Sequence, residues 1–196
     1  MILTITNLNK QYANGVHALK DVSFSIERGM FGLLGPNGAG KSSLMRTLAT
    51  LQEADSGSVT LGDIDVLAEK DKVRKVLGYL PQEFGVYPRT SATDLLHHLA
   101  ILKGFDNKKE RTEMVDYLLQ KVNLFEHRKK AVSSYSGGMR QRFGIAQCLI
   151  GSPKLVIVDE PTAGLDPESS DSFCCGPDPW YLGYFYSCNI DIQSIL

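Results

Sequence analysis

The stretch GPNGAGKSS, residues Gly35–Ser43, decides how the rest of the chain is interpreted. It matches the pattern G-x-x-x-x-G-K-[ST] and lies between an apolar run, MFGLL, and a segment with helical leucine spacing, KSSLMRTLATL. In such a loop the glycines let backbone N–H groups surround phosphate oxygens, and the helix that follows adds its partial positive charge. The stretch therefore predicts a phosphate-binding loop. Its members are Gly35, Pro36, Asn37, Gly38, Ala39, Gly40, Lys41, Ser42 and Ser43.

Two residues of this loop and an acidic pair further along the chain have separate predicted roles. The Lys41 ammonium can bridge the β- and γ-phosphates of a nucleotide, and the Ser42 hydroxyl can ligate Mg2+. The apolar run LVIV is followed by Asp159, whose carboxylate can hold the Mg2+ shell. Glu160 comes next and is the candidate general base for the attacking water. Together these residues predict a site that hydrolyses a nucleotide bound with Mg2+.

A third motif, SYSGGMRQR, occupies Ser134–Arg142. Ser136, Gly137 and Gly138 stand at the start of a predicted helix, where a hydroxyl and closely approaching N–H groups can bind a second phosphate. Taken alone, the motif has a simpler interpretation, an N-cap serine followed by flexible glycines. Both interpretations place a helix start at Ser136.

The hydrophobic pattern predicts an α/β fold with an antiparallel start. ILTIT and VSFSI alternate apolar and polar residues, as half-exposed antiparallel strands do, with Val22, Phe24 and Ile26 facing inward. MFGLL and LVIV are continuous apolar runs, typical of parallel strands buried on both faces. SGSVTLGDIDV predicts two short strands around a Gly-Asp turn. Leu44, Leu48 and Leu51 are expected on one face of the helix after the phosphate loop.

The middle of the chain is predicted to be helical. Ser91 with Asp94, and Asn107 with Glu110, resemble capping boxes ahead of two helical leucine and valine patterns. The first of these patterns includes Leu102. A third helix begins at SGGM and ends by the Gly-Ser-Pro of IGSP. Strands, a phosphate loop and a helical insertion together predict a P-loop NTPase with a parallel core sheet, an N-terminal antiparallel β subdomain and a helical subdomain.

Composition excludes several other classes of protein. The chain has 196 residues, 43% of them hydrophobic and 22% charged, and a net charge of −1, so no overall basic field attracts nucleic acid. It holds no apolar run of the roughly 18 residues that span a bilayer, and its start lacks the pattern of a signal peptide. We therefore expect a cytosolic protein. Its cysteines, expected as free thiols, are Cys148, Cys174, Cys175 and Cys188.

The order of the motifs resembles one family among P-loop proteins. The phosphate loop is followed by LPQ ending at Gln82, YSGGM at Tyr135–Met139, VDE ending at Glu160, and AGLD ending at Asp166. This order is similar to that of the nucleotide-binding domain of ABC-type ATPases, from about Ile2 to Pro167. Tyr135 and Met139 depart from the family pattern at the ends of the YSGGM motif. The resemblance implies one such domain over residues 1–167.

The resemblance also implies roles and partners. Gln82 would contact Mg2+ or the attacking water, Asp166 would lie in the loop between two domains, and Tyr12 would stack on adenine. A tyrosine that merely packs near a strand end is the alternative for Tyr12. Two copies would face head to tail, each ATP lying between one phosphate loop and the other copy's Ser136–Gly138. Closing and reopening of this pair would drive a separate permease, as in a bacterial exporter whose ATPase is peripheral on the inner face of the cell membrane.

Residues 168–196 differ from what the resemblance implies. The family continues with a basic helix and a buried strand ending near a histidine that contacts the γ-phosphate, whereas this stretch contains no Lys, Arg or His. We consider an out-of-frame or truncated ending first, then a divergent ATP-binding subunit deficient in hydrolysis, then a variant completed by its partner. ABC-type repair ATPases are disfavoured because the segment between Lys41 and Ser136 is too short for their coiled coil. Translation ATPases usually carry two domains, and nucleoside kinases lack the SGGM motif.

Overall fold

The computed structural model describes residues 1–29, 31–81, 85, 89–159 and 189–191. These residues belong to two compact units. The first contains residues 1–77 together with 189–191, and the second contains residues 78–159. The expected division at residue 167 falls outside the described residues and stays a prediction.

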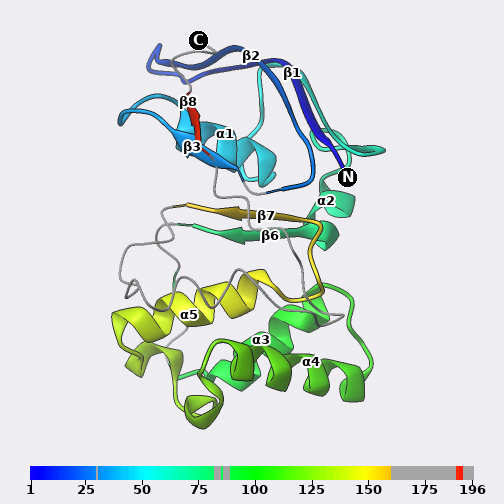
Figure 1. Cartoon of the computed structure of the whole chain (residues 1–196), viewed down its shortest axis with the longest axis vertical. Coiled ribbons are helices and arrows are strands. Elements are labelled where there is room, and N and C mark those ends of the chain that lie inside the picture. Colours follow the sequence, from blue (N-terminus) through cyan, green and yellow to red (C-terminus); the bar gives the residue numbers. More distant parts are fainter. Residues whose placement is uncertain (30, 82–84, 86–88, 160–188, 192–196) are drawn as a thin grey trace. The chain divides into compact units, whose positions relative to one another are not determined.

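An antiparallel sheet forms the start of the first unit, as the alternating pattern predicts (Figure 1). Its strand order is β2-β1-β4-β5, and each neighbouring pair is antiparallel. Ile5 on the central strand pairs with Phe24 on one side and Val59 on the other. Val22 and Ile26 are buried as predicted, whereas Phe24 is only half-buried. The strands are β1 (Leu3–Gln11), β2 (His17–Ile26), β4 (Ser56–Leu61) and β5 (Ile64–Asp65).

The phosphate loop of the first unit lies between strand β3 (Gly32–Leu34) and helix α1 (Lys41–Leu48). Strand β3 pairs in parallel with β8 (Asn189–Asp191), so part of the C-terminal stretch contributes to this unit. The same unit also contains helix α2 (Lys70–Val76). Parallel pairing of β3 agrees with the expected parallel core.

Two details of the expected burial around α1 are wrong. Leu34 is 54% exposed, although the apolar run predicts a strand buried on both faces. Among the described residues β3 has a neighbour, β8, along one edge only, so it lacks the central place in a sheet that the apolar run predicts. Leu51 is 63% exposed because α1 ends at Leu48 and Thr50 adopts φ 60°, which turns the chain out of the helical face.

Strands β6 (Leu77–Leu80) and β7 (Leu155–Val158) lie side by side and run in the same direction (Figure 1). The Asp159 N–H donates to the Leu80 carbonyl at 2.9 Å, which extends their pairing past the end of β7. Leu155, Val156 and Ile157 are buried, as the LVIV run predicts. The carboxyl end of β7 therefore carries the first residue of the acidic pair.

Helices make up the rest of the second unit, and the N-cap half of each predicted capping box is confirmed. Ser91 Oγ accepts from the Asp94 N–H at 3.1 Å. Asn107 Oδ1 accepts from the N–H groups of Lys109 and Glu110 at 2.9 and 3.3 Å. The helices are α3 (Ala92–Leu102), α4 (Lys108–Lys121) and α5 (Gly137–Cys148), with 3-10 turns η1 (Phe125–His127) and η2 (Val132–Ser134). Fully buried side chains at their centre are Leu96, Val115, Leu119, Leu124 and Phe143.

The end of α3 departs from the predicted pattern. Leu102, expected on the buried face, is 71% exposed because α3 ends there and the chain turns back at Gly104, where φ is 91°. This turn brings the half-buried Phe105 against Gly151, at which an added Cβ would lie 2.7 Å from the Phe105 ring.

No helix within the described ranges has the length and apolar character needed to cross a membrane.

Candidate nucleotide site

The backbone of the phosphate loop has the conformation that its glycines predict. Gly40, the N-cap of α1, adopts the left-handed conformation with φ 79°. A Cβ at this position would lie 2.2 Å from the Ala18 carbonyl oxygen. Glycine is therefore required both for the left-handed conformation and for the close packing. Gly38 also has a positive φ of 88°, but an added Cβ there would have nothing within 4 Å. The loop is therefore closely packed at Gly40 and open at Gly38.

The first turn of α1 suits an anion. The first N–H groups of an α-helix have no partner within the helix, and here they belong to residues that include Lys41, Ser42 and Ser43. The first turn contains no acidic side chain that would repel a phosphate. Backbone donors and the helix's partial positive charge thus meet at the residues that the sequence motif identifies.

Lys41 folds back over the loop that precedes it. Its ammonium donates hydrogen bonds to the carbonyl oxygens of Gly35 and Pro36, the second at 2.8 Å. The Pro36 carbonyl also accepts from the Ala39 N–H at 3.2 Å, which closes the turn. The side chain that the sequence assigns to the β- and γ-phosphates is therefore positioned across the mouth of the loop, where a positive charge assists phosphate binding.

The two serines after Lys41 have different surroundings. Ser42 is exposed on the first turn of α1, and its predicted role as a metal ligand stays a prediction. Ser43 is only 9% exposed, and its Oγ lies 2.9 Å from the hydroxyl oxygen of Tyr12. Within the described residues, no group of three or more His, Cys, Asp or Glu could hold a metal ion. Mg2+ commonly takes only one or two protein ligands plus phosphate oxygens, so Ser42 remains a suitable ligand.

Tyr12 lies beside α1 although it comes from the turn between β1 and β2. Its N–H donates to the Val16 carbonyl at 2.8 Å, and its carbonyl accepts from the Gly15 N–H at 2.9 Å. Its hydroxyl donates to Gln52 Oε1 at 2.9 Å, and the residue is 36% exposed. The structure thus brings the Tyr12 hydroxyl to Ser43 at the end of the phosphate loop, and stacking of its ring on adenine stays a prediction. It also adds Gln52, which no sequence motif indicates.

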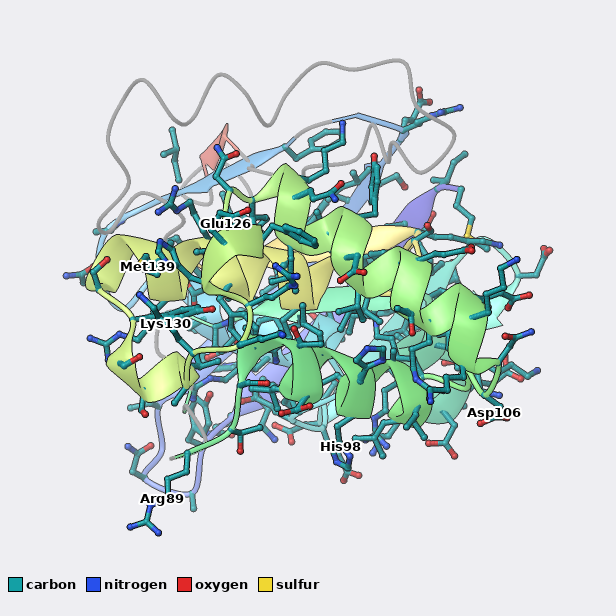
Figure 2. The ribbon with its side chains drawn as sticks, turned by 90° about the horizontal axis from the view of Figure 1, so that it is seen from below. Arg89, His98, Asp106, Glu126, Lys130 and Met139 are labelled. Carbon is teal, nitrogen blue, oxygen red and sulfur yellow. The ribbon has the colours of Figure 1, made fainter. Side chains whose placement is uncertain are left out.

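Helix α5 of the second unit begins within YSGGM (Tyr135–Met139), the signature motif. Ser136 is the N-cap, and its Oγ accepts from the Met139 N–H at 3.3 Å, so the simpler interpretation of this serine is confirmed. An added Cβ at Gly137 would have nothing within 4 Å, which leaves its backbone open to close approach. Figure 2 shows Met139 on the first turn of α5. A phosphate-binding role for Ser136, Gly137 and Gly138 stays a prediction.

Of the remaining predicted site residues, Asp159 alone lies within the described part of the chain. Asp159 stands at the carboxyl end of β7, held there by its backbone bond to Leu80. Gln82, Glu160 and Asp166 lie outside the described residues. Their roles, and the joint action of Asp159 with Ser42 of the other unit, stay predictions.

A parallel strand, a glycine loop and a helix that begins with Lys-Ser define the class of P-loop nucleotide-binding proteins. The family model of the ABC transporter family matches residues 19–163 of this chain. The chain therefore belongs to the ABC transporter family. The matched range includes the phosphate loop and the LPQ, YSGGM and VDE motifs, but not Tyr12.

Curated relatives share over a third of their aligned residues with this chain. The linearmycin resistance ATP-binding protein LnrL of Bacillus subtilis is 37% identical over 86% of this chain and 54% of LnrL. The phosphonates import ATP-binding protein PhnC 1 of Rhodopseudomonas palustris (strain BisB18) is 39% identical over 87% of this chain and 67% of PhnC 1. This chain thus spans about half to two thirds of the length of the curated relatives it matches.

Solved structures agree with this family. The ABC transporter cassette MJ0796, in a dimeric structure, superposes with a TM-score of 0.77 at 27% identity, covering 87% of this chain and 78% of MJ0796. A dimeric structure of MJ0796 in a post-hydrolysis state, bound to ADP and Pi, gives a TM-score of 0.78 at 28% identity. Its coverage is also 87% of this chain and 78% of MJ0796.

Proposed function

We propose that this chain is the ATP-binding subunit of a membrane ABC transporter. It binds MgATP at the phosphate loop, and hydrolysis at a head-to-tail pair of such domains drives a separate permease. The observation that carries the proposal is the Lys41 ammonium, held over the loop by the Gly35 and Pro36 carbonyls at the start of an acid-free helix. Family membership supports the same nucleotide, because the matched relatives are named as ATP-binding proteins.

The chemistry is divided among a few residues. Lys41 and the first N–H groups of α1 hold the phosphates, and Tyr12 supports the base. Ser42, Gln82 and Asp159 would hold Mg2+, which neutralises phosphate charge when bound. Glu160 accepts a proton from the attacking water.

A second copy of this chain is the proposed partner at the nucleotide. Its Ser136, Gly137 and Gly138 approach the γ-phosphate, while Asp166 contacts the facing copy. The exposed backbone at Gly137 permits this approach, and the dimeric MJ0796 structures support the pairing. The permease places the pair on the cytoplasmic face of the membrane. The sequence favours an exporter, while the matched relatives include a resistance protein and an importer.

Titration calorimetry and a steady-state phosphate assay test this proposal. The unsubstituted chain should bind MgATP, and Lys41→Met should weaken binding about tenfold or more through loss of charge-assisted bonds. Lys108→Met, at an exposed position of α4, is the matched control and should bind normally. Absence of MgATP binding by the unsubstituted chain contradicts the proposed function.

A second candidate function is a nucleotide-binding protein deficient in hydrolysis. The observation favouring it is that no histidine follows Glu160, so residues 161–196 supply no imidazole to the γ-phosphate. Glu160→Gln separates the two functions. MgATP turnover that Glu160→Gln abolishes supports the transporter engine, whereas MgATP binding without such turnover supports the second candidate.

A further inference from the structure

Gln52 takes part in a hydrogen-bond network beside the phosphate loop. Its Oε1 accepts from the Tyr12 hydroxyl at 2.9 Å. Its Nε2 donates to the Ser43 carbonyl at 3.3 Å and to Thr47 Oγ1 at 3.2 Å. Gln52 therefore connects the turn that carries Tyr12 with the first half of helix α1.

The hydrogens of this network allow one orientation of the Gln52 amide. With the Gln52 oxygen facing Tyr12, the single hydrogen of the tyrosine hydroxyl goes to Gln52. Tyr12 then accepts a hydrogen bond from the Ser43 hydroxyl. The Thr47 hydroxyl gives its hydrogen to the Ser43 carbonyl at 2.8 Å. A flipped amide would turn its oxygen toward that same carbonyl, placing two acceptors together. Gln52 therefore presents an acceptor, and not a donor, to Tyr12.

The network is anchored on the side of α1 and open on the side of Tyr12. Thr47 and Ser43 are only 1% and 9% exposed, whereas Tyr12 is 36% exposed. The backbone of Tyr12 is held by the turn, through its bonds with Val16 and Gly15. With the hydroxyl held by Gln52, the aromatic ring is fixed at both ends while part of it stays exposed to solvent.

We propose that Gln52 is a positioning residue that fixes the Tyr12 ring for stacking on the base of a bound nucleotide. The inference rests on the proposed function, in which this chain binds ATP. Gln52 acts through Tyr12 and needs no contact with the nucleotide. A side chain that is already ordered loses less conformational freedom when a ligand binds, so fixing the ring strengthens binding of the base.

Fluorine NMR of the ligand-free chain labelled with 3-fluorotyrosine tests the contact itself. The Tyr12 resonance is the one that disappears in Tyr12→Phe. Gln52→Met, which keeps the side-chain length but removes both polar atoms, should shift and narrow this resonance because the ring gains mobility. A resonance unchanged in Gln52→Met overturns the proposal.

Calorimetry with two probes tests the consequence for binding. Gln52→Met should weaken binding of MgATP about three- to tenfold, and that of Mg-tripolyphosphate, which lacks a base, less than twofold. Tyr12→Phe should give a similar loss, and the double variant should be no weaker than either single one, since both remove the same bond. Gln120→Met, at an exposed position of α4, is the matched control and should bind both probes normally.

Two outcomes of the binding experiment overturn the proposal. Equal weakening of both probes would assign Gln52 to the phosphate helix, and additive losses in the double variant would separate it from Tyr12. Binding of neither probe by the unsubstituted chain would contradict the proposed function instead. The fluorine resonance would then still decide whether Gln52 fixes the ring.

Discussion

The Tyr135 hydroxyl donates a hydrogen bond of 2.9 Å to the backbone carbonyl of His127. Tyr135 directly precedes Ser136, is 3% exposed and packs edge-on against Phe143 with ring centroids 6.3 Å apart. The intervening chain is tied to the start of α3, since the Arg128 carbonyl accepts from the Thr93 N–H at 3.1 Å. Tyr135, which departs from the family pattern, therefore forms a hydrogen bond that holds the start of the signature motif in place.

Tyr135→Phe should lower the free energy of unfolding by about 1 kcal/mol, because it removes this bond but keeps the ring. Its effect should also depend on pH. Burial raises the pKa of Tyr135 above its usual 10.0, so the unfolded chain loses this proton first and stability falls as the pH rises past 10. Urea unfolding at pH 7.5 and above pH 10 measures both effects. An equal loss of stability at the two values would show that Tyr135 does not titrate in this way.

Gly40→Ala should be more destabilising than Gly38→Ala, although both replace loop glycines with positive φ. The left-handed conformation costs an alanine about 1–2 kcal/mol at either position. At Gly40 the new methyl group would also lie 2.2 Å from the Ala18 carbonyl, whereas at Gly38 it would have nothing within 4 Å. We expect a loss of about 1 kcal/mol for Gly38→Ala and at least about 2 kcal/mol for Gly40→Ala in urea unfolding. Similar losses would remove the distinction between a packed and an open loop position.

The features that the sequence predicted well are local ones. The N-caps Ser91 and Asn107 bond to residues within three positions of themselves, so their geometry follows from the helix itself. The contact between Tyr12 and Gln52 joins residues 40 positions apart and depends on how a turn meets a helix. The burial expected of Leu34 is wrong for a similar reason, since the exposure of a strand residue depends on which distant elements cover its face.

His97 should make the chain less stable in mild acid. Arg111 Nε donates to His97 Nδ1 at 3.3 Å, a contact that needs a neutral imidazole. Burial, assisted by the Arg111 charge, lowers the pKa of His97, while Asp94 and Asp116 oppose the shift and Lys108 adds to it. The unfolded chain therefore binds a proton first, so the stabilisation is complete above pH 6.5 and is lost as the pH falls through the lower, folded pKa.

His97→Asn should flatten this part of the stability profile between pH 7 and pH 5, because asparagine can accept from Arg111 but does not titrate. The neighbouring His98 is exposed and is labelled in Figure 2, and His98→Asn is the matched control that should keep the slope. Urea unfolding across this range gives the slope for each variant. A slope that survives in His97→Asn would assign the acid sensitivity to another group.

Cys148 should resist thiol reagents for as long as the second unit stays folded. It ends α5, is 4% exposed and is a free thiol, and burial raises its pKa to about 12. At pH 8 roughly one thiol in ten thousand would then be ionised, and the thiolate is the reactive form. In a variant with serine at Cys174, Cys175 and Cys188, Ellman's reagent should give no colour in buffer and one equivalent in urea. Further replacement by Cys148→Ala should abolish the urea signal, and rapid labelling in buffer would show that α5 does not bury this thiol in solution.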